Sequence, residues 1–250
     1  MMYIKSTNNA RCGIRFPIPQ YRGEGITLYN NTGGELIAGD VVTIIYTGTS
    51  GQEVQGIKPP AAGIANVLAE MAVAIETIAA GTIGKFLQSG WSVPTMVEGS
   101  SADVVAGSYL ECISGIIDFD GTATNTAVTK GTGVTKDTFT DSDAGLVTDG
   151  YLPGMRVVLG GSLTTAANAG TYTIYTVAAA TITFTKVGQI NTAEAGITGL
   201  TLVAQGHLRT EATTTRSLNS IAIAQASYAT NAVALMNCHW LGTKVTLATS

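Results

Sequence analysis

The sequence predicts an all-β fold: a core of short strands arranged as a β-sandwich or barrel, an inserted second β domain, and an extended N-terminal arm. Only 12% of the 250 residues are charged and 45% are hydrophobic, which favours strands over helices, whose exposed face normally carries Glu, Lys and Arg. Alternating apolar segments are separated by glycine and proline throughout, as in short-stranded sandwiches and barrels.

A short phrase occurs three times, at 34–44, 102–113 and 150–159: an apolar pair, a glycine and an alternating strand. We expect the glycine of each copy to adopt the positive φ of a tight turn, because glycine has no Cβ to oppose it. We interpret the phrase as a reused turn and not as three equivalent repeats.

Residues 1–25 predict the arm. Pro17 and Pro19 favour extended backbone without ladder donors. Ile14, Phe16 and Ile18 alternate on one face and would be buried against a neighbouring subunit; the alternative is a free terminus. The candidate partner-binding residues are Arg11, Ile14, Arg15, Phe16, Ile18, Tyr21 and Arg22.

The core domain is expected at 26–116 together with 205–250. Its predicted strands are 26–29, 40–46, 85–87, 91–93, 95–97, 109–113, 220–226, 232–236 and 244–247. The segment 64–78 fits both helical spacing and, toward its end, a strand, so both alternatives stay open.

The inserted β module is expected at 117–204, where the chain becomes denser in threonine and glycine. Strands are predicted at 155–159, 171–177 and 180–186, the last two forming a hairpin. After Gln205 the composition returns to that of residues 26–116, so the module is expected to interrupt the core domain.

An apolar run followed by DxDGT, at 115–122, is the sharpest chemical motif. It resembles haloacid-dehalogenase-type phosphatases, which would make Asp118 a nucleophile and Asp120 an acid/base group beside Mg²⁺. Those enzymes need alternating strands and helices, whereas threonine- and glycine-rich strands follow here. We interpret the string as a polar turn and keep a phosphatase as a distant alternative.

Other reactive side chains have simpler structural interpretations. A Ca²⁺ site would draw on Asp118, Asp120, Asp137, Asp141, Asp143 and Asp149, but the sequence lacks the closing glutamate of an EF-hand. The glycines of 81–84 followed by Lys85 lack the spacing of a phosphate loop. His207 and His239 are expected to be structural, and Cys12, Cys112 and Cys238 to be buried apolar side chains, with a disulfide or zinc site as alternatives. We therefore predict no catalytic, cofactor-binding or metal-binding residues.

The net charge of −4 does not indicate the positively charged surface that binds nucleic acid or an anionic membrane. No apolar run reaches the roughly 18–20 residues of a membrane-spanning helix, and the N-terminus lacks a secretory signal. We expect a protein made in the cytoplasm. Because so few residues are charged, we also expect much of its surface to be covered by copies of itself or by a partner.

The strings 30–42, 75–84, 104–110 and 221–226 resemble tailed-bacteriophage head decoration (cement) proteins, and 139–174 looks like a small β module of phage structural proteins. This resemblance implies a non-enzymatic virion protein, made in the host cytoplasm. It would bind the capsid exterior as a homotrimer and clamp neighbouring major capsid protein subunits. A tail, neck or fibre-base protein is the alternative. The module would serve display, glycan binding or lateral contact.

Overall fold

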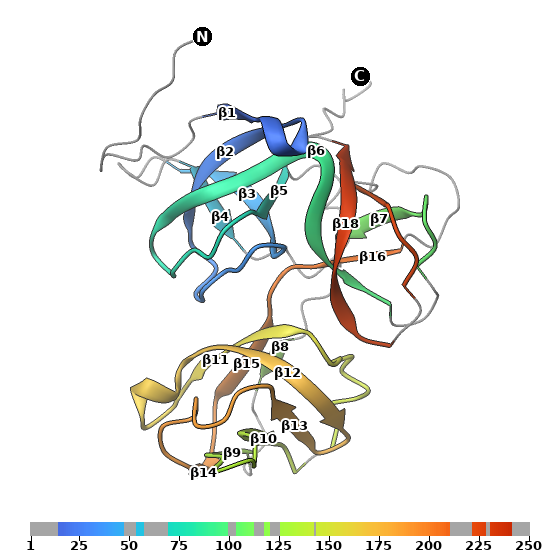
Figure 1. Ribbon diagram of the computed structural model, residues 1–250. Helices are drawn as coiled ribbons and strands as arrows, with labels where there is room; N and C mark the ends of the chain where they lie inside the picture. The colour runs from blue at the N-terminus through green and yellow to red at the C-terminus, as the bar shows by residue number, and fades with distance from the viewer. Residues whose placement is uncertain are drawn as a thin grey trace, which may run out of the picture.

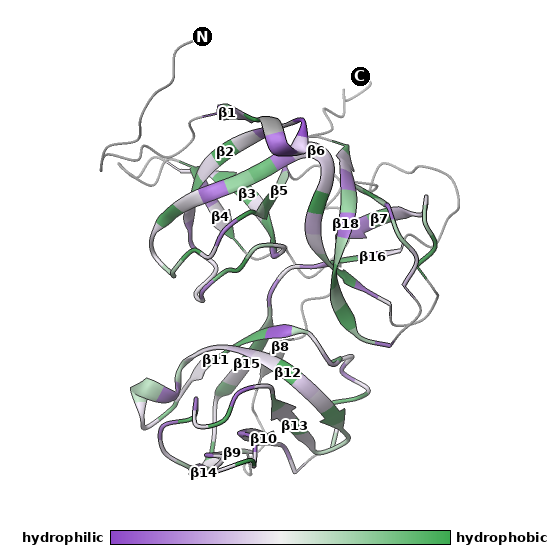
Figure 2. Cartoon of the chain, in the orientation of Figure 1, coloured by the Kyte–Doolittle hydropathy of each residue, from purple (hydrophilic) through white to green (hydrophobic). Residues whose placement is uncertain are grey.

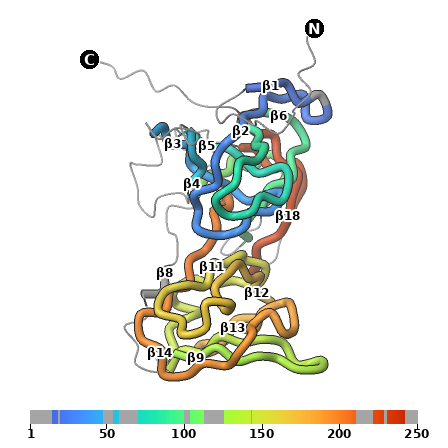
Figure 3. Tube along the Cα trace, turned by 90° about the vertical axis from the view of Figure 1, so that its left-hand side faces the viewer, coloured from blue at the N-terminus to red at the C-terminus, as the bar shows by residue number. Residues whose placement is uncertain are grey.

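The computed structural model describes residues 15–47, 54–57, 70–99, 104–112, 118–120, 126–142, 144–210, 222–228 and 231–241. Within these residues the regular elements are strands, apart from two short 3-10 turns, η1 (Pro19–Tyr21) and η2 (Ala166–Asn168). The chain is therefore all-β, as predicted. Its strands form two sheets, which lie one above the other in Figures 1 and 3.

The ten-stranded sheet closes on itself twice. It contains β1 (Arg15–Ile18), β2 (Gly23–Asn30), β3 (Val41–Tyr46), β4 (Val54–Ile57), β5 (Met71–Ala74), β6 (Ile83–Glu98), β7 (Tyr109–Cys112), β16 (Leu208–Thr210), β17 (Ala222–Ala224) and β18 (Val233–Leu241). Strands β2, β4, β3, β5 and the N-terminal half of β6 form one ring of pairings, the first barrel. The C-terminal half of β6, β16, β7, β17 and β18 form another, the second barrel.

The 16-residue strand β6 belongs to both barrels because it bends in its middle. Gly90 has a φ of +151° and Ser92 a φ of +53°. A Cβ at Gly90 would lie 2.7 Å from the carbonyl oxygen of Tyr21, so glycine is required for this close approach. Before the bend Phe86 fills the first barrel, and after it Val97 fills the second.

Alternation of side chains along the strands builds both interiors. Hydrophobic and hydrophilic bands alternate along β2 and β6 in Figure 2. The first barrel buries Ile26, Leu28, Leu36, Val42, Ile44, Val54, Ala72, Ala74, Ile78 and Phe86. The second buries Val93, Val97, Val104, Leu110, Cys112, Leu208, Ala222, Ala224, Met236, Cys238 and Trp240.

The eight-stranded sheet is formed by residues 118–204, between β7 and β16. Its order is β14 (Glu194–Ile197), β9 (Thr126–Thr129), β10 (Thr138–Thr140), β13 (Thr181–Phe184), β12 (Gly170–Ala178), β11 (Arg156–Gly161), β15 (Leu200–Ala204) and β8 (Asp118–Asp120). Strand β12 pairs with β11 before a bulge at Ile174 and Thr176, and with β13 from there on. Side chains from the strands on both sides of this bulge form one core cluster, which also includes Met96 and Val233 of the second barrel.

Several sequence predictions are confirmed in detail. The three phrase glycines, Gly39, Gly107 and Gly154, have φ values of +103°, +94° and +83°. The predicted hairpin is β12–β13. The expected strands at 85–87, 91–93 and 95–97 are parts of one strand, β6. The sequence divided it because Gly90 and Pro94, near its bend, are typical turn residues. The end of the ambiguous segment 64–78 is strand β5; residues 58–69 and the predicted strand 244–247 lie outside the described residues.

Candidate functional site

The described part of the predicted arm is a strand of the chain's own sheet. Strand β1 pairs antiparallel with β2, from Arg15 opposite Ile26 to Ile18 opposite Gly23. Ile18 is buried, and Phe16 packs against the same cluster. Ile18 is therefore buried by its own chain, and Phe16 is partly buried by it, whereas their alternation predicted burial against a neighbouring subunit. Arg11 and Ile14 lie outside the described residues.

The polar residues of the arm remain at the surface. Arg15 forms an ion pair with Glu24 at 3.4 Å, and both side chains are about half exposed. Arg22 is exposed and has a φ of +46°, while Tyr21 is partly buried. Non-glycine residues at positive φ are uncommon and often mark functional positions.

A partly exposed aromatic pair lies on β6 and β18, at the bend of β6 that the arm contacts through Tyr21. The ring of Trp91 stacks on that of His239, with centroids 3.9 Å apart and an interplanar angle of 15°. Trp91 is 52% exposed, and burial lowers the pKa of His239. The sequence does not predict this pair, because Trp91 and His239 are far apart along the chain.

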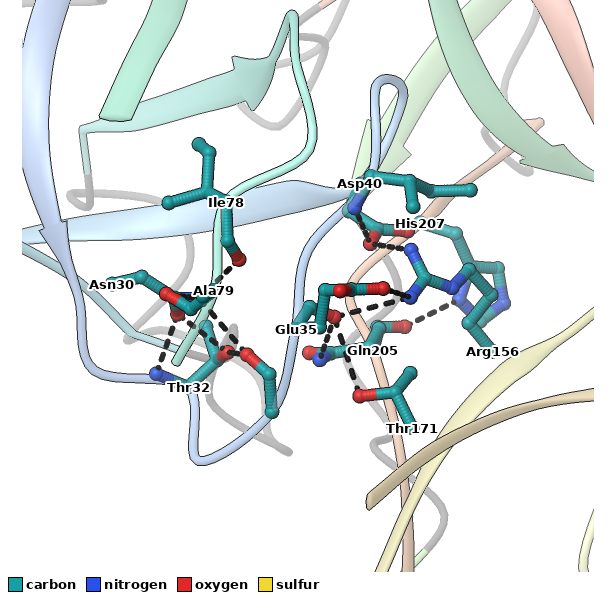
Figure 4. A network of polar contacts seen from close by, with 12 residues as sticks. Asn30, Thr32, Glu35, Asp40, Ile78, Ala79, Arg156, Thr171, Gln205 and His207 are labelled. Carbon is teal, nitrogen blue, oxygen red and sulfur yellow. Dashed lines mark hydrogen bonds and ion pairs between the residues drawn. The ribbon is translucent and has the colours of Figure 1, made fainter. Parts of the chain in front are cut away.

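A buried ion pair joins the module to the first barrel. Arg156, on β11, donates from Nη1 to Asp40 Oδ2 at 2.7 Å, and both side chains are buried. Its Nη2 donates to the carbonyl of Glu35 at 3.1 Å (Figure 4). Asp40 also accepts the N–H of Ile37 and so orders the turn that contains Gly39. Burial raises the pKa of Asp40 to about 6, against the opposing effect of the Arg156 guanidinium.

Further polar contacts surround this pair. The Thr171 hydroxyl and the Gln205 side-chain amide both donate to the Glu35 carbonyl, at 3.3 and 3.4 Å. His207 Nδ1 lies 3.0 Å from the Gln205 carbonyl, and its Nε2 lies 3.2 Å from Glu98 Oε2. Both ring nitrogens thus face oxygens, and a neutral ring carries only one N–H. The ring of His207 links the Gln205 carbonyl to the Glu98 carboxylate.

This junction network is suited to holding the two sheets together. Backbone bonds reinforce it, since Gln205 donates to the Arg156 carbonyl and Val233 to the Pro153 carbonyl, both at 2.7 Å. The charges of Arg156 and Asp40 are paired with each other inside the protein. Sequence reasoning could not find the network, because Asp40 and Arg156 are 116 residues apart.

Among the described residues, the aspartates considered as catalytic or calcium-binding groups lie in the strands and loops of the module. Asp118 and Asp120 belong to β8, which pairs with β15, and their side chains lie outside what the structure describes. The buried Asp137 carboxylate accepts backbone N–H groups of Gly131, Gly188 and Ile190 at 2.6–2.8 Å. In the described part of the chain, no three His, Cys, Asp or Glu side chains come together as a possible metal site.

The cysteines and the Gly81 segment are also structural. Cys112 and Cys238 are buried free thiols, and burial raises the pKa of each to about 12. Gly81 has a φ of +72° in the turn before β6, where its N–H donates to the Asn30 carbonyl. Cys12 lies outside the described residues.

Comparison of the chain with protein-family models, with curated proteins and with solved structures finds no match. Among the described residues no helix is long and apolar enough to span a membrane. The functional interpretation therefore depends on the residues and their geometry.

Proposed function

We propose that the chain is a virion structural protein that binds the outer surface of a tailed-bacteriophage capsid. It acts as a homotrimer and stabilises contacts between major capsid protein subunits, without enzymatic activity. One observation carries the proposal: a weakly charged all-β body exposes large apolar side chains. On the barrels, which carry the proposed attachment surface, the described ones are Tyr46, Trp91, Val105 and Leu235. Such side chains favour protein contacts over solvent.

The fold suits a clamp between subunits. A clamp must resist deformation, and here the closed barrels share β6 while the junction network ties the module to them. A capsid lattice presents many equivalent sites, so modest contacts add up across a multivalent assembly. The attachment needs neither a cofactor nor a catalytic group.

The arm end of the barrels is the proposed attachment surface. Arg15 and Arg22 supply positive charge for an acidic partner surface, and Tyr21 and Trp91 supply aromatic area. Tryptophan, tyrosine and arginine are enriched among the residues that dominate binding energy at protein interfaces.

Co-sedimentation with empty capsid shells tests the proposal. The shells are assembled from the major capsid protein encoded in the same genome. We expect the full chain to pellet with the shells and Trp91→Ala to bind roughly tenfold more weakly or worse. Val147→Ala, which changes an exposed side chain on the module, serves as the control and should bind like the wild type. No binding to shells, or equal binding by all three proteins, would contradict the proposal.

A truncation tests the arm separately. It must stop at residue 14, because Ile18 belongs to the core and removal of β1 would damage the sheet. We expect weaker attachment with an unchanged circular dichroism spectrum; unchanged attachment would remove the arm from the contact. Binding to tail or neck assemblies in place of shells would support the alternative location. Metal-dependent phosphatase activity that is lost in Asp118→Asn would overturn the non-enzymatic role.

A further inference from the structure

The two barrels repeat one order and direction of strand pairing. In the first, β2–β4 is parallel, and β4–β3, β3–β5, β5–β6 and β6–β2 are antiparallel. In the second, β6–β16 is parallel, and β16–β7, β7–β17, β17–β18 and β18–β6 are antiparallel. Thus β6, β7, β16, β17 and β18 correspond in this order to β2, β3, β4, β5 and the N-terminal half of β6.

Backbone hydrogen bonds around the glycine turn repeat as well. Gly39 donates to the carbonyl of Ala74 at 2.8 Å, and Ala74 donates back to the residue after Gly39 at 2.9 Å. Gly107 and Ala224 make the same two bonds, at 2.8 and 2.9 Å. Four residues beyond each alanine the chain returns to the turn through a further β-bridge. These bridges join Leu36 to Ile78 in the first barrel and Val104 to Tyr228 in the second.

The side chains follow the same correspondence. Segments 72–79 and 222–229 share alanine at their first, third and last positions. Equivalent interior pairs are Ile26 and Val93, Val42 and Leu110, Ile44 and Cys112, and Phe86 and Cys238. The chain therefore contains an internal repeat. The interpretation of the phrase as only a reused turn is wrong for its first two copies, which occupy equivalent positions.

The third copy is a reused turn. Gly154 donates to Ile174, which donates back to the residue after Gly154, both at 2.8 Å. The module around it has a different strand order. It lies between β7 and β16, where the first barrel has the short connection between β3 and β4.

The repeat reveals a difference in how equivalent faces are covered. The docked face is the turn 37–39 with Val41, Thr43 and Val73, and all three of these side chains are buried. The second barrel covers its turn, since the Met96 N–H donates to the Gly39 carbonyl at 2.9 Å and the Leu235 side chain packs on Gly39. Gly206 accepts the Val41 N–H.

The corresponding face of the second barrel is open. It consists of the turn 105–107 with Tyr109, Glu111 and Ile223, which are partly exposed. Val105 is 56% exposed, and no atom of the described residues lies within 4 Å of the position that a Cβ would take at Gly107. The open face thus presents apolar area at the place where its equivalent is buried by a barrel of the same chain.

We propose that the open face binds a second copy of this chain. A barrel of this sequence already covers the equivalent face inside the molecule, so the fold has a demonstrated mode of barrel-on-barrel contact there. Repeated between chains, the contact is heterologous: one copy's open face meets a different surface of the next. Contacts of this type close into rings, of which a trimer is one, when the rotation between successive copies completes a full turn. The inference rests on the self-association in the proposed function but not on capsid binding.

The contact between copies uses the residues of the first barrel that are equivalent to those of the internal contact. Met96 and Leu235, which cover the docked face, correspond by strand register to Tyr29 and Ile83 of the first barrel. An incoming first barrel therefore brings large side chains with much apolar area, as the internal contact does. Because this contact joins separate chains, association should be reversible and depend on concentration.

Sedimentation velocity of the full chain across a concentration series tests the proposal. We expect the wild type to associate and Val105→Asp to associate roughly tenfold more weakly or worse, because a buried unpaired charge opposes docking. Ala106→Glu changes a second exposed position on the turn and should weaken association as Val105→Asp does. Val147→Asp is the matched control, with 55% exposure on the module, and should associate like the wild type.

The outcomes separate the two proposals. A wild type that stays monomeric at every attainable concentration, or association that survives both open-face substitutions, would overturn the assigned interface. Equal weakening by Val147→Asp would also overturn it, because the effect would then come from charge alone. Intact association through the open face with no binding to capsid shells would overturn capsid attachment only.

Discussion

Replacement of Arg156 by methionine tests whether the junction network holds the module on the first barrel. Methionine keeps much of the length and apolar stem but removes the guanidinium. The substitution breaks a 2.7 Å ion pair with a carboxylate that is 1% exposed, and it removes the donor to the Glu35 carbonyl. Loss of one partner of a buried pair costs about 3–5 kcal/mol, because the other charge is left without compensation.

Protonation of Asp40 limits this loss at low pH. Without the guanidinium, the largest effect that opposes burial is lost, so the pKa of Asp40 should rise above its wild-type value of about 6. A protonated Asp40 carries no uncompensated charge. Arg156→Met should therefore destabilise the chain more near pH 8 than near pH 5.

Urea denaturation followed by circular dichroism at both pH values measures the effect. Arg209→Met provides the matched control, since Arg209 pairs with Glu111 at 3.1 Å but its side chain is 41% exposed. Such surface pairs contribute about 0–1 kcal/mol. If Arg156→Met lowered the free energy of unfolding no more than Arg209→Met does, the buried pair would not be what fixes the junction.

Three further predictions follow from single positions. Gly154→Ala should lower the free energy of unfolding by about 2 kcal/mol or more, because a Cβ there would overlap the carbonyl of Val233 on β18. Gly133→Ala is the control, since Gly133 has a positive φ but open space around it, and should cost about 1 kcal/mol. Equal losses in thermal melts would refute the steric reason. The stability of the wild type relative to Asp40→Asn should fall as pH rises from about 4 to 6 in urea titrations, because the folded chain binds more protons than the unfolded chain over that range; a constant difference would contradict the raised pKa. Cys112 and Cys238, whose buried thiols have pKa values of about 12, should resist a thiol reagent until the chain unfolds; rapid labelling of either in the native protein, located by mass spectrometry, would contradict their burial.

Local signals predicted the strand content well. Alternation identified β2, β3 and the β12–β13 hairpin, because successive side chains of a strand point to opposite faces of the sheet. The phrase glycines were predicted at positive φ because a tight turn before an alternating strand requires it. Such features depend on residues close together in the sequence.

Features that depend on distant residues escaped prediction. The single strand β6 was divided into three, because Gly90 and Pro94 read as turn residues whether the chain turns or only bends. The repeat was hidden because its second copy is interrupted by residues 118–204 and shares few identities with the first. The partners of Arg156 and His207, and the burial of Ile18 by its own chain, depend on how the sheets pack together.

A cryo-electron microscopy map of particles made by the genome that encodes this chain would show where the chain lies on the particle. We expect density on the capsid exterior that fits the two barrels and the module, with the arm end of the barrels against major capsid protein subunits. Purified particles that lack the chain, or carry it only in the tail or neck, would contradict the account.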